Sequence, residues 1–111
     1  MEIRERREGA FIVLSPAGRI DNDTSAAFQQ KLLASIAATA ARVVVDLSGV
    51  EFISSAGLGA LMTAAKQAKA AQARIAVASL RPVVQEIFTI SRFGHVVPVF
   101  GTPADAMAAL Q

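Results

Sequence analysis

Two short apolar runs in the middle of the chain constrain the fold most strongly. They occupy residues 43–47 and 75–78, and they are rich in β-branched residues. Almost every position in them is apolar, which is typical of strands that are covered on both faces. Such strands occur in parallel sheets that carry helices on both sides. The two runs therefore predict the centre of an α/β fold.

Segments with helical spacing separate the predicted strands. The polar run at residues 21–24 offers several caps for a first helix, and a second helix is expected to begin near Ser55. Apolar residues recur on one side of both segments, as helices that cover a sheet require. The residues expected on these inner faces are Phe28, Leu32, Leu33, Ile36, Leu58, Leu61, Met62 and Ala65.

Proline and glycine mark the elements in the last third of the chain. Pro82 suits the first position of a third helix, which Gly94 is expected to end. Residues 96–99 can form a strand only at a sheet edge, because Pro98 has no N–H. Thr102 is expected to cap a fourth helix.

The first residues are expected to form strands as well. Residues 2–7 alternate weakly and carry charges of alternating sign, which indicates a solvated edge strand. A turn near Gly9 leads to an apolar run at residues 11–14, which residues 16–18 are expected to break. The alternative interpretation of the charged cluster, a nucleic-acid patch, would need clustered basic residues without intervening acids.

The resulting order is strand, strand, helix, and then strand–helix three times. This alternation predicts an α/β fold with a mostly parallel open sheet of about five strands and four helices. The 111 residues suit one compact domain, so we expect one domain over residues 1–111.

Composition narrows the classes of function. The chain has no cysteine, which excludes disulfides, thiolate metal sites and cysteine nucleophiles. Its formal charge is only +2, and no apolar stretch approaches membrane-spanning length. The start shows no basic segment that leads into an apolar run, as a signal peptide would. We therefore expect a soluble, cytoplasmic protein that binds no nucleic acid, membrane, metal or cofactor.

The most informative segment spans residues 45–59, where a strand ends and a helix begins at Ser54 or Ser55. In open α/β sheets, sites tend to lie just beyond the carboxyl end of a strand. The free N–H groups at a helix start can stabilise a phosphate there. Because Ala56, Gly57 and Gly59 are small, the backbone of another protein could approach closely.

Other interpretations of this segment stay open at this stage. A serine at a helix start is usually a cap, which contributes about 1 kcal/mol. Dinucleotide binding is not favoured, because residues 57–59 lack the third glycine of that fingerprint. Hydrolase activity is not favoured either, because Ile53 replaces the first glycine of Gly-x-Ser-x-Gly and His95 is the only histidine. The chain is therefore not expected to be an enzyme.

Residues 46–59 resemble the signature of the STAS domain family, as found in bacterial anti-sigma-factor antagonists. In that signature, Asp-Leu-Ser is followed by a short loop, an aromatic residue, a small polar pair with serine, and Gly-Leu-Gly. Residues 18–21 (Gly-Arg-Ile-Asp) are similar to the Gly-x-Leu-Asp of the family before its first helix. Residues 82–84 and 93–94 resemble its third-helix region.

The resemblance implies a phosphorylation switch at Ser55, with Ser54 as the rival acceptor. It implies an unphosphorylated form that binds an anti-sigma factor, which is also a serine kinase of the GHKL ATPase type. Phosphorylation would release that partner, and a PP2C-like phosphatase would reset the switch. The partner-binding residues that it implies are Asp21, Asp23, Ser54, Ser55, Ala56, Gly57 and Leu58.

Two positions depart from the family pattern. Ser54 stands where many antagonists have Asp, and Ala56 stands where Ser is common. The acceptor therefore lacks the usual neighbouring carboxylate. Asp21 and Asp23 have the alternative role of capping the first helix, and Asp46 is expected to anchor N–H groups of the following loop.

The alternative function within the family is a STAS subunit or scaffold that works without phosphorylation. Such a subunit would dock on the ATPase of a transporter or on another regulatory protein.

Overall fold

The computed structural model describes residues 1–39 and 42–111 of the chain. The elements in chain order are β1 (Ile3–Glu8), β2 (Phe11–Pro16), β3 (Gly18–Ile20), α1 (Ser25–Thr39), β4 (Arg42–Asp46), β5 (Val50–Ile53), α2 (Ser55–Ala70), β6 (Arg74–Ala78), α3 (Pro82–Ile90), the 3-10 helix η1 (Phe93–His95), β7 (Val99–Phe100) and α4 (Pro103–Leu110).

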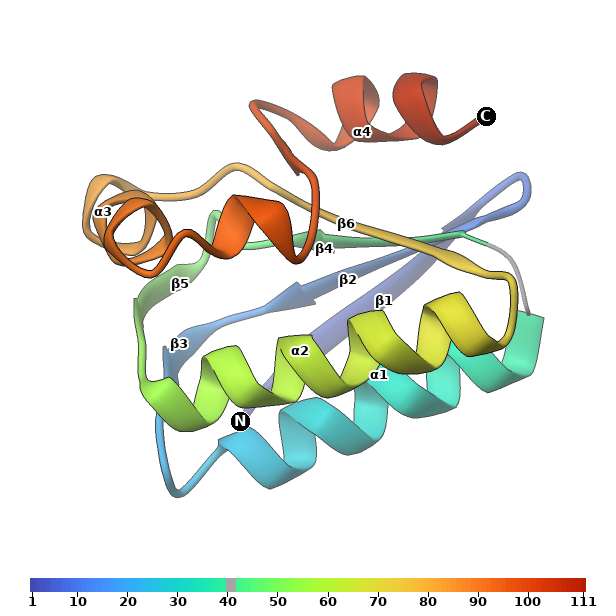
Figure 1. Ribbon diagram of the computed structural model, residues 1–111. Helices are drawn as coiled ribbons and strands as arrows, with labels where there is room; N and C mark the ends of the chain where they lie inside the picture. Colours follow the sequence, from blue (N-terminus) through green and yellow to red (C-terminus); the bar gives the residue numbers. More distant parts are fainter. Residues whose placement is uncertain (40–41) are drawn as a thin grey trace.

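The main sheet has five strands in the order β1-β2-β4-β6-β7. Strand β1 pairs antiparallel with β2, and the other neighbours are parallel. Helices α1 and α2 lie side by side on one face of this sheet, and α4 lies on the opposite face (Figure 1). The predicted fold class, an α/β domain with a mostly parallel five-stranded sheet and four α-helices, is confirmed for the described residues.

The two faces of the sheet explain the continuous apolar runs. Val43 and Val45 point into the core under α1 and α2, whereas Val44 belongs to the cluster beneath α4. Strand β6 alternates in the same way, with the small Ala76 and Ala78 on the α4 side. Both faces of the central strands are thus buried, and the small side chains let α4 approach the sheet closely.

Strand β1 forms a charged edge, as predicted. All of its residues are exposed except Ile3, which is half-buried. Lys31 of α1 forms an ion pair with Glu5, with 2.7 Å between Nζ and Oε1. The hydrogen bond from Lys31 lowers the pKa of the Glu5 carboxyl. Charge on both sides of this strand discourages pairing with another chain.

Strands β3 and β5 form a separate two-stranded parallel sheet, which the sequence analysis missed. Residues 16–18 were expected only to break a strand, but β2 continues through Pro16 and β3 begins at Gly18. Gly18 has a φ of 99°, which a glycine adopts readily. Its N–H donates to Gly49 O at 2.9 Å, and this bond joins β3 to the loop before β5.

Two further boundaries were predicted wrongly. Helix α3 ends at Ile90 rather than at Gly94, and Arg92 takes the left-handed conformation with a φ of 54°. The strand expected at residues 96–99 is reduced to β7, because Val96 and Val97 donate their N–H groups to Phe93 O.

Candidate functional site

The start of α2 is fixed by hydrogen bonds of Ser54. Its N–H donates to Ile20 O at 2.8 Å, which extends the β3–β5 pairing by one bond. Its Oγ accepts from Gly57 N at 3.2 Å, and its extended backbone (φ −89°, ψ 175°) is that of an N-cap residue. Ser54 is therefore the cap, and the idea that Ser55 caps the helix is wrong.

Ser55 occupies the first turn of α2 and is exposed. Within the described residues, its hydroxyl makes no hydrogen bond, and the cap position before it is filled by Ser54. The first turn of α2 contains no acidic residue. The arrangement thus presents a hydroxyl to solvent at the positive end of a helix of 16 residues.

Gly57 is buried and faces into the protein. A Cβ placed on it would lie 2.6 Å from Ile53 Cγ1 and 2.7 Å from Ile20 Cγ2. Its small size lets α2 pack against β3 and β5, so the domain itself needs this glycine. Gly59 differs, because it is exposed and a Cβ there would meet nothing within 4 Å.

Ala56 and Leu58 are half-buried, and both flank Gly57 at the start of α2. Leu58 packs against the main core with part of its side chain. The exposed remainder of both residues lies beside Ser55, where the sequence analysis placed a partner surface.

Asp21 directly follows β3, so it lies next to the start of α2. Its Oδ1 accepts the N–H groups of Asp23 at 3.0 Å and Thr24 at 3.2 Å. The carboxylate of Asp21 therefore orders the turn before α1, and neither of the two N–H groups belongs to the helix, which begins at Ser25. Asp23 is exposed, and its carboxylate has no partner among the described residues.

Two hydrogen bonds of Ser48 hold the loop before β5 in place. Asp46 Oδ1 accepts from Ser48 N at 3.1 Å, as predicted for this residue. Arg81 Nε donates to Ser48 O at 2.8 Å, which ties the loop to the start of α3. Glu51 is exposed on β5.

Arg19 and Phe52 form a pair that the sequence analysis did not predict. The register of β3 and β5 sets Arg19 opposite Phe52, and the guanidinium carbon lies 4.5 Å from the centroid of the ring. Arg19 is exposed and Phe52 is half-buried. The signal for this pair was absent from the sequence, because neither short strand shows a clear alternating pattern.

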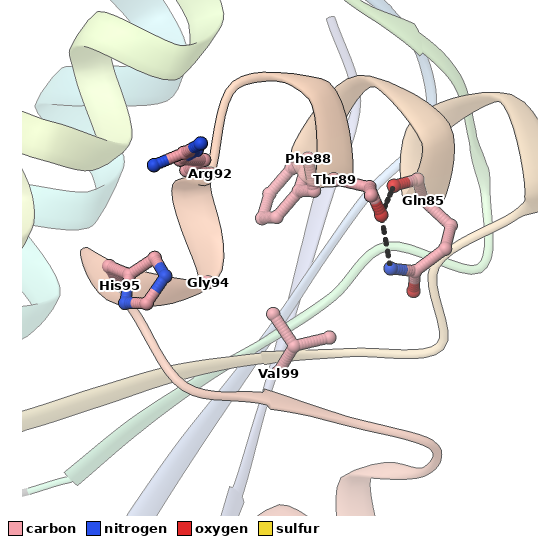
Figure 2. A pocket seen from close by; sticks show the side chains of 7 residues that line it. All are labelled: Gln85, Phe88, Thr89, Arg92, Gly94, His95 and Val99. Carbon is pink, nitrogen blue, oxygen red and sulfur yellow. Dashed lines mark hydrogen bonds between the residues drawn. The ribbon is translucent and has the colours of Figure 1, made fainter.

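His95 belongs to η1, between α3 and β7 in the chain, and not to the start of α2. It lines an open pocket of about 270 Å³ between α3, η1 and β7. Figure 2 shows the hydrogen-bonded side chains of Gln85 and Thr89 on one side of this pocket and Arg92 and His95 on the other. The pocket lining includes neither Ser54 nor Ser55.

Residues 1–39 and 42–111 contain no group of three or more His, Asp or Glu side chains that could hold a metal ion. No helix in the same part of the chain is both long enough and apolar enough to cross a membrane.

The sequence model of a family described as "Mlab, STAS domain" matches residues 3–98. The chain therefore belongs to the STAS domain family. This family includes anti-sigma factor antagonists, which are regulatory proteins rather than enzymes.

Particular relatives lie within that family. BtrV of Bordetella bronchiseptica, provisionally named as an anti-sigma factor antagonist, is 33% identical over 111 residues, which cover 100% of this chain and 96% of BtrV. An anti-sigma factor antagonist from Mycobacterium paratuberculosis has a crystal structure with a TM-score of 0.87 and 26% identity, covering 98% of this chain and 92% of that one.

The fold is also similar to that of the Bacillus anti-sigma factor antagonist SpoIIAA. Its unphosphorylated form has a TM-score of 0.80 at 16% identity, with 97% of this chain and 95% of SpoIIAA covered. Its phosphorylated form has a TM-score of 0.73 at 15% identity, with 99% and 100% covered. At this level of identity the likeness concerns the fold.

Proposed function

We propose that this chain is an anti-sigma factor antagonist in a partner-switching pathway of the cytoplasm. Unphosphorylated, it binds an anti-sigma factor that is also a serine kinase of the GHKL ATPase type. Phosphorylation of Ser55 releases this partner, and a PP2C-like phosphatase restores the binding form. The relationship to BtrV supports the pathway, and the existence of SpoIIAA in a phosphorylated form supports the kind of switch.

The observation that carries the proposal is the division of labour between the two serines. Ser54 accepts the capping hydrogen bond from Gly57 N, so the orientation of its hydroxyl oxygen is set by the helix. Ser55 is exposed, and its hydroxyl makes no hydrogen bond within the described residues. A kinase can therefore take the Ser55 proton without first breaking a contact that holds the domain together.

In this proposal the chain supplies no catalytic group. The kinase brings Mg-ATP and the base, and the domain presents the hydroxyl that attacks the γ-phosphorus. The hydroxyl proton passes to the kinase base, the new P–O bond forms on Ser55, and ADP leaves. The domain is thus substrate and binding partner, and not an enzyme.

The added phosphate acts through charge and hydration. It carries about −1.5 to −2 charges. At an effective dielectric constant near 20, a partner carboxylate about 6 Å away is repelled by on the order of 3 kcal/mol per unit charge. Because 1.4 kcal/mol corresponds to a tenfold change in affinity, a loss of about a hundredfold follows without any rearrangement of the fold.

The docking surface is expected to surround Ser55. Asp23 offers an exposed carboxylate from the turn before α1, and Asp21 holds that turn in shape. The exposed parts of Ala56 and Leu58 supply apolar contact from α2. Gly57 contributes indirectly, because it seats the helix against β3 and β5.

Mapping of the phosphate tests the proposal directly. The purified chain is incubated with Mg-ATP and the GHKL-type kinase encoded by the same genome, and the modified residue is located by mass spectrometry. We expect a single phosphate on Ser55, none on Ser55→Ala, and normal phosphorylation of Thr63→Ala, an exposed site elsewhere on α2. Phosphate found only on Ser54, or none, would contradict the proposal.

Binding measurements test the switch itself. Ser55→Ala is expected to bind the kinase in the presence of ATP as tightly as without it, and Ser55→Asp is expected to bind at least tenfold more weakly, because the aspartate mimics part of the phosphate charge. Calorimetric titration gives both affinities. Docking on a transporter ATPase without phosphorylation would instead show binding to that ATPase that Ser55→Asp leaves unchanged.

A further inference from the structure

Arg19 lies beside the start of α2 for reasons of strand register. Ile20, the next residue, pairs with Ile53 and accepts the Ser54 N–H at 2.8 Å. Adjacent strands in a sheet lie about 4.8 Å apart. Arg19 thus directly precedes Ile20, which contacts Ser54, and Ser55 directly follows Ser54.

The guanidinium of Arg19 is held in place by stacking, and its N–H groups stay available for hydrogen bonds. It lies over the Phe52 ring at 4.5 Å, and stacking of this kind engages the flat face of the group. The N–H donors point outward in the plane of the guanidinium, so they stay available to an anion. Among the described residues, no carboxylate pairs with Arg19, whereas Arg4 and Arg6 each bind a glutamate of β1 or its flank.

Acidic side chains near Ser55 do not occupy this arginine either. Asp21 Oδ1 is directed to the backbone N–H groups of its own turn. Asp23 and Glu51 are exposed and form no ion pair among the described residues. The residues directly before and after the acceptor are Ser54 and Ala56, so no carboxylate adjoins Ser55 in the chain.

The reach is sufficient for contact with a group on Ser55. Phe52 and Ser55 are three residues apart, so their Cα atoms are separated by at most about 10 Å. The turn of the chain into α2 shortens this separation. Arg19 lies on the neighbouring strand, about 4.8 Å from Phe52, so the combined length of an arginine and a phosphoserine side chain spans the separation from Ser55.

We propose that Arg19, held on the ring of Phe52, pairs with the phosphate when Ser55 is phosphorylated. The inference rests on the proposed function in that Ser55 is the acceptor. Arg19 is then a positioning residue for the phosphorylated state, and charge-assisted N–H···O bonds hold the phosphate against its own domain. The pairing also removes an exposed cation from the surface around Ser55 at the moment of phosphorylation.

Titration of the phosphate tests this pairing without any kinase. Phosphoserine is placed at position 55 during translation by stop-codon suppression, and the second pKa of the phosphate, ordinarily about 6, is followed by phosphorus NMR. A neighbouring arginine favours the dianion, so it lowers this pKa. We expect Arg19→Gln to raise the phosphate pKa by about half a unit, as an exposed ion pair allows. Arg19→Lys, which keeps the charge, is expected to raise it less.

Arg42→Gln is the matched control. Arg42 also stacks on a phenylalanine, with its guanidinium carbon 5.8 Å from the Phe11 ring, but it lies at the amino end of β4. The substitution is expected to leave the phosphate pKa unchanged. Equal titration curves for Arg19→Gln and Arg42→Gln would overturn the proposal.

A second measurement uses stability. Thermal midpoints of the phosphorylated and unphosphorylated forms are compared in the parent chain, in Arg19→Gln and in Phe52→Leu, which removes the stacking surface. We expect phosphorylation to raise the thermal midpoint less in both variants than in the parent chain. An equal rise in Arg19→Gln and in the parent chain would contradict the pairing. Neither measurement uses a kinase. The absence of a kinase reaction would therefore contradict the proposed function, whereas the pairing of Arg19 with the phosphate could still be tested.

Discussion

Helices α2 and α4 both begin with a hydroxyl side chain that accepts a hydrogen bond from the N–H group three residues further on. In α2 the bond joins Ser54 Oγ to Gly57 N at 3.2 Å, and in α4 it joins Thr102 Oγ1 to Asp105 N at 3.1 Å. The residues after the cap differ. Helix α4 continues with a proline at its first position and Asp105 in its first turn, whereas α2 continues with the exposed Ser55 and no acidic residue.

The difference separates a structural helix start from one suited to modification. In α4, the carboxylate of Asp105 balances the positive end of the helix dipole. In α2, that end lacks an acidic residue, so a negative charge added there is stabilised by the helix. Phosphorylation at Ser55 would therefore supply to α2 what Asp105 already supplies to α4.

The largest expected effect concerns the packing of α2 against β3 and β5. Gly57→Ala is expected to lower the free energy of unfolding by about 1–3 kcal/mol, because its Cβ would press on two buried isoleucines. Gly59→Ala is the control in the same helix. It meets nothing within 4 Å and should raise the free energy of unfolding by up to about 1 kcal/mol through better helix propensity. Urea denaturation measures both, and equal effects would contradict the close packing of Gly57.

The next effect tests the roles of the hydroxyl groups. Ser54→Ala and Thr102→Ala are each expected to cost about 1 kcal/mol of stability, because both remove a cap. Ser55→Ala should change the free energy of unfolding by less than about 0.5 kcal/mol, as is usual for an exposed side chain without partners. If denaturation curves showed Ser55→Ala to be as costly as Ser54→Ala, the division of labour between the serines would be wrong.

The smallest effect tests the charges directly. Ser55→Asp is expected to stabilise the fold by about 0.3–1 kcal/mol, and Asp105→Asn to destabilise it by a similar amount, because each changes the charge at a helix start. Both effects should shrink in about 1 M salt, where the screening length falls to about 3 Å. Unfolding midpoints at low and high salt measure the two changes. A salt-independent effect would point to hydrogen bonding instead of charge.

The sequence predicted the parts of the fold that have strong and continuous signals. Residues 43–47 and 75–78 are apolar on both faces, and Pro82 and Thr102 mark helix starts by their own chemistry, so β4, β6, α3 and α4 were all located. Strands β3 and β5 were missed because they have only 3 and 4 residues. Arg19 and Glu51 also interrupt their apolar residues, so neither segment shows a continuous apolar run such as residues 75–78.

The details of the site needed tertiary information. Two adjacent serines can both cap a helix, and the sequence offers no means to choose between them. The bond from Ser54 N to Ile20 O makes the choice, because it keeps Ser54 extended and starts the helix after it. The pair of Arg19 and Phe52 depends on the same unpredicted strand pairing. The phosphoacceptor role of Ser55 stays a prediction.

The separation of β3 and β5 from the five-stranded sheet has a consequence for how such a domain can diversify. The residues that surround Ser55 sit on a small ladder of their own, with Ile20 and Ile53 turned inward and Arg19 and Phe52 turned outward. Exchange of the outward pair alters the surface without disturbing the hydrogen bonds of the main sheet. Domains with the same fold can thus differ in the partners that they bind, and the partner specificity can be redesigned without changing the main sheet.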